Sequence, residues 1–116
     1  MKSNAELVKL IDELKKTSYE HKAKIWKTVA VKLEKPLRNM AEVNLSRIER
    51  NAKNNETVII PGKVLGSGDV NKPLTVAAFS FSDNAKKKIL CAKGKVFTIR
   101  ELMEKNPEGS NIRIMG

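Results

Sequence analysis

The segment that runs from Ile59 to Asp69 constrains the fold of this chain more than any other. It reads Ile-Ile-Pro-Gly-Lys-Val-Leu-Gly-Ser-Gly-Asp, so an apolar strand runs into a Pro-Gly pair and then into a second glycine-rich turn. Proline has no amide hydrogen, and glycine lowers the steric barrier to unusual backbone angles. We therefore expect a sharply turned loop at residues 61–66, which can press its backbone and the cation of Lys63 against something negatively charged.

The charge of the whole chain favours such a partner. Lysine and arginine number 23 against 13 acidic residues in a chain of 116, which gives a net charge of +10. The excess is spread over both halves of the chain, with no basic tail. Basic side chains held near phosphates displace condensed counterions, so a polyanion is the expected partner. The alternative is a basic protein that has no polyanionic partner.

The sequence carries few signals for other classes of protein. No apolar run approaches the roughly 20 residues of a membrane span, and the first residues lead into a charged segment instead of an apolar leader. A single cysteine, Cys91, cannot form an internal disulfide, which fits a reducing cytosol. One cysteine and one histidine, His21, cannot build a zinc site. We expect a cytoplasmic protein with no membrane partner, metal or cofactor.

Two apolar stripes at helical spacing predict a pair of helices in the first third of the chain. The first stripe is Leu7, Leu10, Ile11 and Leu14. The second stripe is Tyr19, Ala23, Trp26, Ala30 and Leu33. Ser3 and Glu6 form a capping box at the start of the first helix. We expect the pair Thr17-Ser18 to separate the helices and Pro36 to end the second.

Short strands and short helices alternate after this helical pair. The segments with strand-like composition are 41–44, 57–60, 74–81, 95–97 and 111–115. The segments expected to be helical are 45–53, 82–92 and 98–105. Capping boxes are expected at Ser46 with Glu49 and at Thr98 with Glu101. Ser82 or Asp83 is expected to cap the helix between them. Gly94 is expected to end a helix in the left-handed conformation.

A weak internal repeat supports this alternation. Residues 45–62 and 99–116 align without gaps, and each segment reads as a short helix, a polar turn and a strand that ends at glycine. Such a repeat suggests strand–helix units stacked into a small irregular superhelix. We predict one α/β domain over residues 1–116, with N-terminal helices at 1–36 and a repetitive α/β body at 37–116.

The glycine-rich segment does not fit a nucleotide-binding loop. A P-loop needs lysine after its second glycine and a hydroxyl residue next. Here Lys63 follows the first glycine and precedes valine, and Pro73 stands where a helix would have to start after residues 66–68. The acidic residues are scattered, and three glutamates are explained as capping residues. The sequence therefore predicts no enzyme and no small-molecule substrate.

Three polar clusters fit contacts with phosphate. Asn44, Ser46 and Arg47 lie at a strand-to-helix junction, where helix amides favour anions. Gly62 and Lys63 lie in the expected loop. The third cluster is Lys86, Lys87 and Lys88 at a helix start, where their charge opposes the helix dipole. One Trp, one Tyr and three Phe leave few platforms for base stacking, so we expect recognition of phosphate and folded RNA shape.

Four segments of this chain resemble a known family. They are Ile25-Trp26-Lys27, Lys35-Pro36-Leu37-Arg38, the run Glu-Val-Asn-Leu-Ser-Arg-Ile at 42–48, and the run Val-Ile-Ile-Pro-Gly-Lys-Val-Leu-Gly-Ser-Gly at 58–68. They are similar to the archaeal and eukaryotic large-subunit ribosomal protein eighteen family, which is related to bacterial large-subunit ribosomal protein fifteen. The resemblance continues in order to the last residue.

This resemblance implies a non-enzymatic component of the large ribosomal subunit that binds large-subunit ribosomal RNA. It also implies neighbouring ribosomal proteins as partners and a body of irregular strand–strand–helix turns. The residues of the matching motifs that we expect to face RNA are Arg38, Asn44, Ser46, Arg47, Gly62 and Lys63. Charge alone adds Lys27, Lys86, Lys87 and Lys88.

Two other functions stay open at the level of sequence. One is a general RNA-binding protein or chaperone that acts outside the ribosome. The other is a small nucleotide-binding enzyme that uses Lys63. Whichever function holds, we expect the isolated protein to be monomeric.

Overall fold

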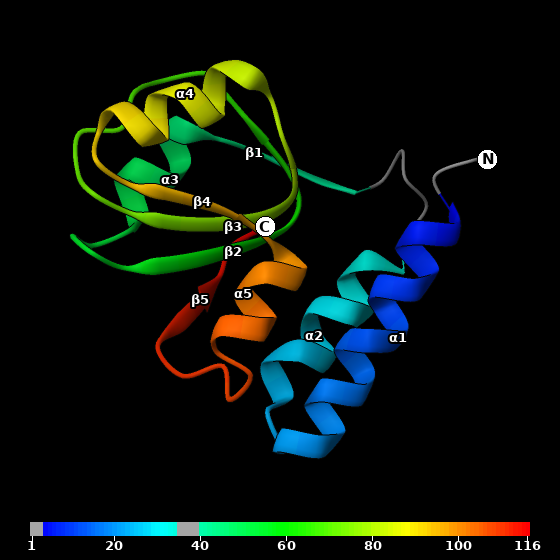
Figure 1. Cartoon of the computed structure of the whole chain (residues 1–116). Helices are drawn as coiled ribbons and strands as arrows, with labels where there is room; N and C mark the ends of the chain where they lie inside the picture. The colour runs from blue at the N-terminus through cyan, green and yellow to red at the C-terminus, as the bar shows by residue number, and fades with distance from the viewer. Residues whose placement is uncertain (1–3, 35–39) are drawn as a thin grey trace.

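The computed structural model describes residues 4–34 and 40–116 (Figure 1). Its helices are α1 (Asn4–His21), α2 (Lys24–Leu33), α3 (Leu45–Asn51), α4 (Asp83–Cys91) and α5 (Ile99–Lys105). Its strands are β1 (Ala41–Asn44), β2 (Thr57–Leu65), β3 (Thr75–Phe81), β4 (Lys95–Thr98) and β5 (Ile112–Ile114). The expected α/β fold with an N-terminal helical pair is confirmed. The predictions for Ser3, Pro36 and Arg38 lie outside the described residues.

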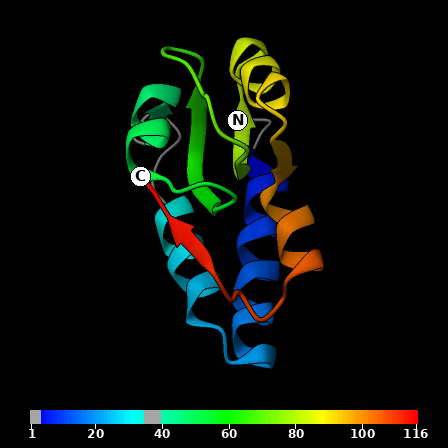
Figure 2. The same ribbon diagram turned by 90° about the vertical axis from the view of Figure 1, so that its left-hand side faces the viewer.

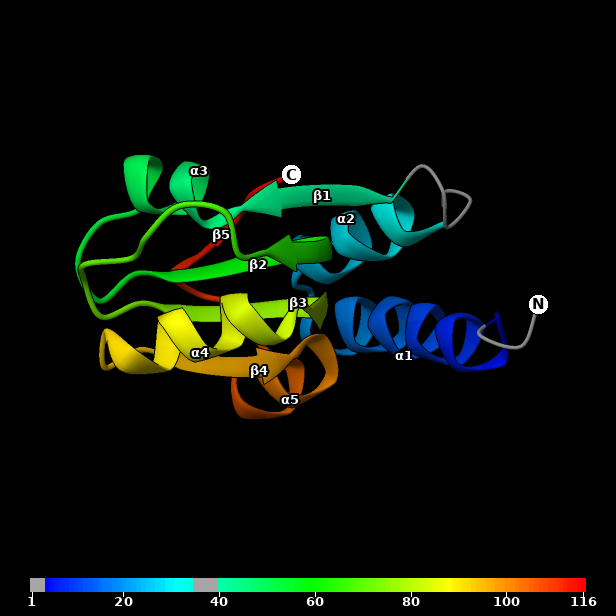
Figure 3. The same ribbon diagram turned by 90° about the horizontal axis from the view of Figure 1, so that it is seen from above.

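The strands form one parallel sheet in the order β1-β2-β3-β4, and β5 also pairs with β2. The first part of β2, at residues 57–59, pairs with β5, whereas residues 62–65 pair with β1. The register with β3 shifts between Ile60 and Lys63, and β2 turns back on itself there (Figures 1 and 3). The sheet is therefore strongly coiled, with helices as crossovers between several of its parallel strands.

Two apolar cores lie on the two faces of the sheet. Ile59 and Ala77 pack with α1, α2 and α5, which form the lower part of the molecule in Figure 2. Val58, Ile60 and Val76 pack with α3 and α4 on the other face. Successive residues of a strand point to opposite faces, so one apolar run supplies both cores.

The boundary between the first two helices differs from the prediction. α1 continues through Thr17 and Ser18 as far as His21, and the chain reverses at Lys22, which has a φ of 53°. Serine and threonine cost little inside a helix, and Thr17 and Ser18 are half-buried within α1. Tyr19 is consequently 86% exposed on α1 and is not part of the apolar face of α2. The rest of the second stripe, from Ala23 onward, is buried as expected.

The internal repeat is confirmed and has a third copy. Each of three helix N-caps is followed eleven residues later by a residue with positive φ, and a strand begins soon after it. The pairs are Asn44 with Asn55, Ser82 with Lys93, and Thr98 with Gly109. Three strand–helix–turn units of one design therefore follow each other along the body.

The helix ends confirm some capping predictions and correct others. Thr98 and Glu101 form the expected capping box, and Ser82 caps α4. The box at Ser46 and Glu49 is wrong, because Asn44 is the N-cap of α3 and Glu49 instead accepts a hydrogen bond from the amide of Asn71 at 3.1 Å. The left-handed residue after α4 is Lys93 and not Gly94. Gly94 is required because a Cβ there would lie 2.4 Å from the carbonyl oxygen of Leu74.

The expected sharp turn is present between Ile60 and Lys63 (Figure 1), but the expected loop at residues 61–66 is wrong, because residues 57–65 form one continuous strand. Pro61 lies at the register shift, where a missing amide hydrogen costs the sheet little. Gly62 does not have a positive φ. A Cβ at Gly62 would lie 2.1 Å from the carbonyl oxygen of Ala41. The Pro-Gly pair therefore bends a strand and lets β1 approach it closely.

Candidate nucleic-acid interface

Of the two glycine-containing turns expected from the sequence, only the one at residues 66–69 is a turn outside a strand. The chain leaves β2 there and passes between α3 and α4 (Figure 3). The ammonium group of Lys88 donates to the carbonyl oxygens of Gly66 at 3.0 Å and Gly68 at 2.7 Å. The amide of Ser46 donates to the carbonyl oxygen of Ser67 at 3.1 Å. Three successive carbonyls thus point inward and are held by the two helices.

The glycines of this turn are needed for close packing. A Cβ at Gly66 would lie 2.9 to 3.0 Å from Asn84 and Ala85 at the start of α4. Gly68 has a φ of 93°, and a Cβ there would lie 2.6 Å from Ser46. The turn is therefore pressed against the first turns of both α3 and α4, which fixes its shape.

The outer side of this turn presents groups that can donate hydrogen bonds. Among the described residues, the amides of Ser67 and Gly68 make no backbone hydrogen bond. The side chain of Asn44 makes no capping bond, and α3 has no acidic residue in its first turn. The exposed residues around the turn include Asp69, Asn84 and four others that can donate hydrogen bonds or lie on the α3 side. We call these four, Asn44, Ser46, Arg47 and Ser67, the turn face.

Lys88 stabilises the glycine-rich turn, a role that the sequence did not predict. Besides its two carbonyl partners, its ammonium lies 3.7 Å from a carboxylate oxygen of Asp69, and its side chain is 32% exposed. Because the ammonium group already has three oxygen neighbours, it has little hydrogen-bonding capacity left for a phosphate. The three lysines therefore differ in environment, because Lys86 and Lys87 are exposed to solvent whereas Lys88 is half-buried. Lys87 lines a depression of about 550 Å³ next to the turn.

Lys63 is separated from the turn face by the pleat of the strand. Val64 is buried in the core under α3 and α4, so Lys63, one residue earlier, points out of the opposite side. The register places Lys63 beside Glu42 of β1 and Ser80 of β3. Gly62 is buried against β1, so packing accounts for it. Lys63 is the exposed member of the pair.

Lys27 lies far from these groups on the outer side of α2. It is exposed and lines a shallow depression of about 600 Å³ together with Lys24 and Lys32. Figure 1 shows α2 extending away from α3 and α4. The structure therefore places the predicted residues on at least three separate surfaces. Only Asn44, Ser46, Arg47, Lys87 and Lys88 gather around the glycine-rich turn.

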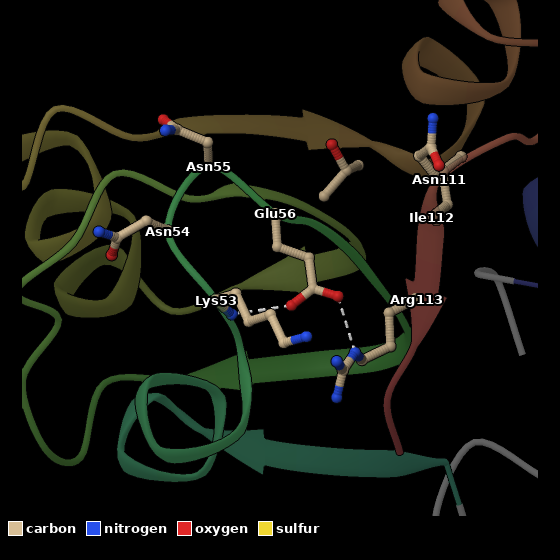
Figure 4. A pocket seen from close by; sticks show the side chains of 8 residues that line it. Lys53, Asn54, Asn55, Glu56, Asn111, Ile112 and Arg113 are labelled. Atoms are coloured by element: carbon tan, nitrogen blue, oxygen red, sulfur yellow. Dashed lines mark hydrogen bonds and ion pairs between the residues drawn. The ribbon is translucent and has the colours of Figure 1, made fainter.

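A second polar cluster, around Glu56, was not predicted from the sequence. The carboxylate of Glu56 accepts bonds from the amide of Lys53 and from Nε of Arg113, both at 2.8 Å, and Arg113 comes from the far end of the chain (Figure 4). The amide of Lys53 holds the pKa of the Glu56 carboxyl below its ordinary value, against the effect of burial and with added help from Arg113. The Asn54-Asn55 pair before a strand was the available signal, since it marks a turn.

The described part of the chain offers no candidate for a membrane-spanning helix or a metal site. No helix in residues 4–34 or 40–116 is long and apolar enough to cross a membrane. Within the same ranges, no group of three or more histidine, cysteine, aspartate or glutamate side chains could hold a metal ion.

Comparison with known proteins decides the family. A profile of the family described as ribosomal protein 60S L18 and 50S L18e matches residues 2–116. The chain belongs to this family. A relative from Archaeoglobus fulgidus named large ribosomal subunit protein eL18 is 54% identical over 114 residues, which cover 98% of this chain and 97% of the relative. Proteins of the same name are 52% identical in Methanoregula boonei, covering 98% and 94%, and 49% identical in Methanococcus maripaludis, covering 99% and 96%.

Proposed function

We propose that this protein is a structural constituent of the large ribosomal subunit and binds large-subunit ribosomal RNA through the turn face. Its location is then the ribosome, in the cytoplasm. Membership of a large-subunit ribosomal protein family over nearly the whole chain carries the first part of the proposal. The net charge of +10 supports RNA as the partner.

The geometry of the turn face supports the second part. Lys88 and Ser46 hold the carbonyls of the turn inward, which leaves the amides of Ser67 and Gly68 for an anion. Arg47 adds a cation on the first turn of α3, where its charge opposes the helix dipole unless an anion lies nearby. Phosphate oxygens match this set of donors. Lys63, Lys86, Lys87 and Lys27 then contact other parts of the same RNA.

We also propose that the protein works without catalytic turnover and beside other ribosomal proteins. The family is one of structural proteins. The hypothesis of a nucleotide-binding lysine loses its premise, since Lys63 lies within a strand and not in a phosphate-cradling loop.

The proposal is tested by the salt dependence of RNA binding. Each phosphate contact contributes about 0.7 to 0.9 to the slope of log affinity against log salt concentration. Arg47→Ala should weaken binding to deproteinised large-subunit ribosomal RNA and lower this slope by about one contact. Filter binding at several salt concentrations measures both quantities. Lys63→Glu should also weaken binding and flatten the slope.

Lys9→Ala is the matched control, because it removes the same charge from an exposed site on α1. It should leave the slope nearly unchanged. Equal slopes for the wild type, Arg47→Ala and Lys63→Glu would contradict the phosphate contacts. Sedimentation through sucrose after a moderate salt wash tests the ribosomal location, and protein found mainly off the large subunit would favour a chaperone outside the ribosome.

A further inference from the structure

The cluster around Glu56 and Arg113 lies in a depression of about 490 Å³ that the proposed turn face does not use. Its wall combines residues 53–57 with residues 111–113, which are the turns and strand starts of two copies of the internal repeat. The volume falls within the range of small-ligand sites, which is about 300 to 1,000 Å³. The depression is therefore large enough for one nucleotide.

Arg113 presents a fixed flat surface in this depression. Its Nε donates to Glu56 at 2.8 Å, and its Nη1 donates to the carbonyl oxygen of Asn51 at 3.2 Å. Glu56 is itself held by the amide of Lys53. The Arg113 side chain is still 41% exposed. A guanidinium group is planar and delocalised, and bases of unpaired RNA stack on such planes as they do on aromatic rings.

The rim of the depression carries side-chain amides that are free to bind. Asn54, Asn55 and Asn111 stand around Lys53, Glu56 and Arg113 in Figure 4. Asn55 and Asn111 have φ values of 63° and 60°. Asparagine tolerates such angles partly because its side chain can bond locally. Within the described residues, neither side chain makes a hydrogen bond, so both amides remain available for base edges or a 2′-hydroxyl.

We propose that this depression receives one unpaired nucleotide of ribosomal RNA, whose base stacks on the guanidinium plane of Arg113. Lys53 neutralises its phosphate, and the rim asparagines contact the base edge or ribose. Glu56 neutralises and orients Arg113, which makes it a positioning residue. The proposal rests on the proposed RNA binding but assigns a separate site with separate chemistry: stacking and edge contacts in place of phosphate contacts alone.

The test compares variants that keep the charge or the backbone. Arg113→Lys keeps the positive charge and loses the plane, and Arg50→Lys makes the same change at an exposed position of α3. Asn55→Gly removes an amide at a φ that glycine adopts freely, so this variant should fold at least as well as the wild type. The probe is deproteinised large-subunit ribosomal RNA from an archaeon, read by filter binding and by chemical modification of its unpaired nucleotides.

We expect the wild type to protect one or a few unpaired nucleotides from modification. Arg113→Lys should lose that protection and about threefold to tenfold of its affinity. Asn55→Gly should weaken the same protection, and Arg50→Lys should keep it. The salt slope should stay the same in all four proteins.

Two results would overturn the nucleotide site. One is equal affinity and equal protection in the wild type, Arg113→Lys and Asn55→Gly. The other is a loss of affinity in Arg113→Lys with no change in the protection of any unpaired nucleotide, which would assign Arg113 to the RNA backbone. If the wild type bound none of this RNA, the proposed function itself would fail, so the two failures are distinguishable.

Discussion

Gly62 is the residue at which the fold leaves the least room for a side chain. Its hypothetical Cβ lies 2.1 Å from the carbonyl oxygen of Ala41, so β1 cannot keep its place if residue 62 carries a side chain. We predict that Gly62→Ala lowers the free energy of unfolding by about 1 to 3 kcal/mol, as overpacking commonly does. Urea unfolding followed by circular dichroism measures the loss.

The neighbouring residue supplies the control for Gly62. Lys63→Ala changes an exposed side chain in the same strand and should alter stability by no more than about 0.5 kcal/mol. Equal stability of Gly62→Ala and the wild type would mean that β1 can move away from β2 at little cost.

Two adjacent lysines of α4 should behave differently when each is replaced by methionine. Lys88 holds the carbonyl oxygens of Gly66 and Gly68, and hydrogen bonds that involve a charged group contribute about 1.5 to 3 kcal/mol. We predict that Lys88→Met destabilises the protein on this scale in thermal or urea unfolding. Lys87→Met, at an exposed position, should leave stability nearly unchanged and weaken RNA binding.

The test depends on which of the two variants, Lys88→Met or Lys87→Met, loses more stability. If Lys87→Met were the more destabilising change, the contacts of Lys88 would not support the turn. If Lys88→Met retained full stability and lost only the salt-dependent part of RNA binding, Lys88 would be an RNA contact, as its place in the lysine triplet first suggested.

Single residues also show what the sequence could and could not reveal. The glycines at 62, 66 and 68 were visible as a backbone feature, but only the fold shows which atoms approach them. A close approach depends on a partner that is distant in sequence, such as Ala41 for Gly62. Lysines raise the same difficulty, since Lys87 and Lys88 look alike in sequence and differ only in what lies beside them.

At the scale of elements, the turn before β2 is joined to β5 by Glu56 and Arg113. The folded protein holds the pKa of the Glu56 carboxyl below its ordinary value, chiefly through the hydrogen bond from the amide of Lys53. The ionised carboxyl therefore stabilises the fold above that ordinary pKa, and this contribution is lost as the pH falls through the lower folded pKa. We predict that Glu56→Gln is less stable than the wild type by about 1 kcal/mol at pH 7.

The difference between Glu56→Gln and the wild type should shrink below about pH 4, as urea unfolding at pH 7, 5, 4 and 3 would show. Glu104→Gln, at an exposed position of α5, controls for the loss of one negative charge. Its free energy of unfolding should change with pH in the same way as that of the wild type. A difference that stays constant from pH 7 to pH 3 would show that Glu56 is not protonated over this range or contributes nothing through its charge.

Elements with a local signal were predicted well, and elements that depend on distant partners were not. The capping box at Thr98 and Glu101 and the cap at Ser82 need only a few neighbouring residues. β2 was cut short at Ile60 because Pro61 and Gly62 are strand-breaking types. The strand continues because β1 and β3 pair with residues on both sides of the bend. Tertiary pairing overrode local propensity there.

At the scale of the whole molecule, the two cores share the central strands, which argues for one cooperative unit. Val58 and Ile60 belong to the core under α3 and α4, whereas Ile59 between them belongs to the core of the helical pair. Neither core can lose its strand without exposing the other. The division at residue 36 predicted from sequence therefore separates two kinds of structure within one expected folding unit.

Trp26 makes this cooperativity measurable. It is fully buried in α2, it is the only tryptophan, and its Nε1 donates to the carbonyl oxygen of Pro107 at 2.8 Å. Its fluorescence therefore reports the docking of the helical pair on the C-terminal segment, while circular dichroism reports all helices. We predict that both signals change at the same urea concentration, as in a two-state transition.

Ile59→Ala provides a stricter test of two-state unfolding, because replacing a core isoleucine or leucine by alanine typically lowers the free energy of unfolding by about 2 to 5 kcal/mol. Both transitions should move together to lower urea, since the shared strand couples the two cores. Tryptophan fluorescence that changed well before circular dichroism, in the wild type or in Ile59→Ala, would mean that the helical pair undocks on its own. The α/β body would then be stable without the core that Trp26 anchors, and the net charge carried by α1 and α2 would belong to a separately folding segment.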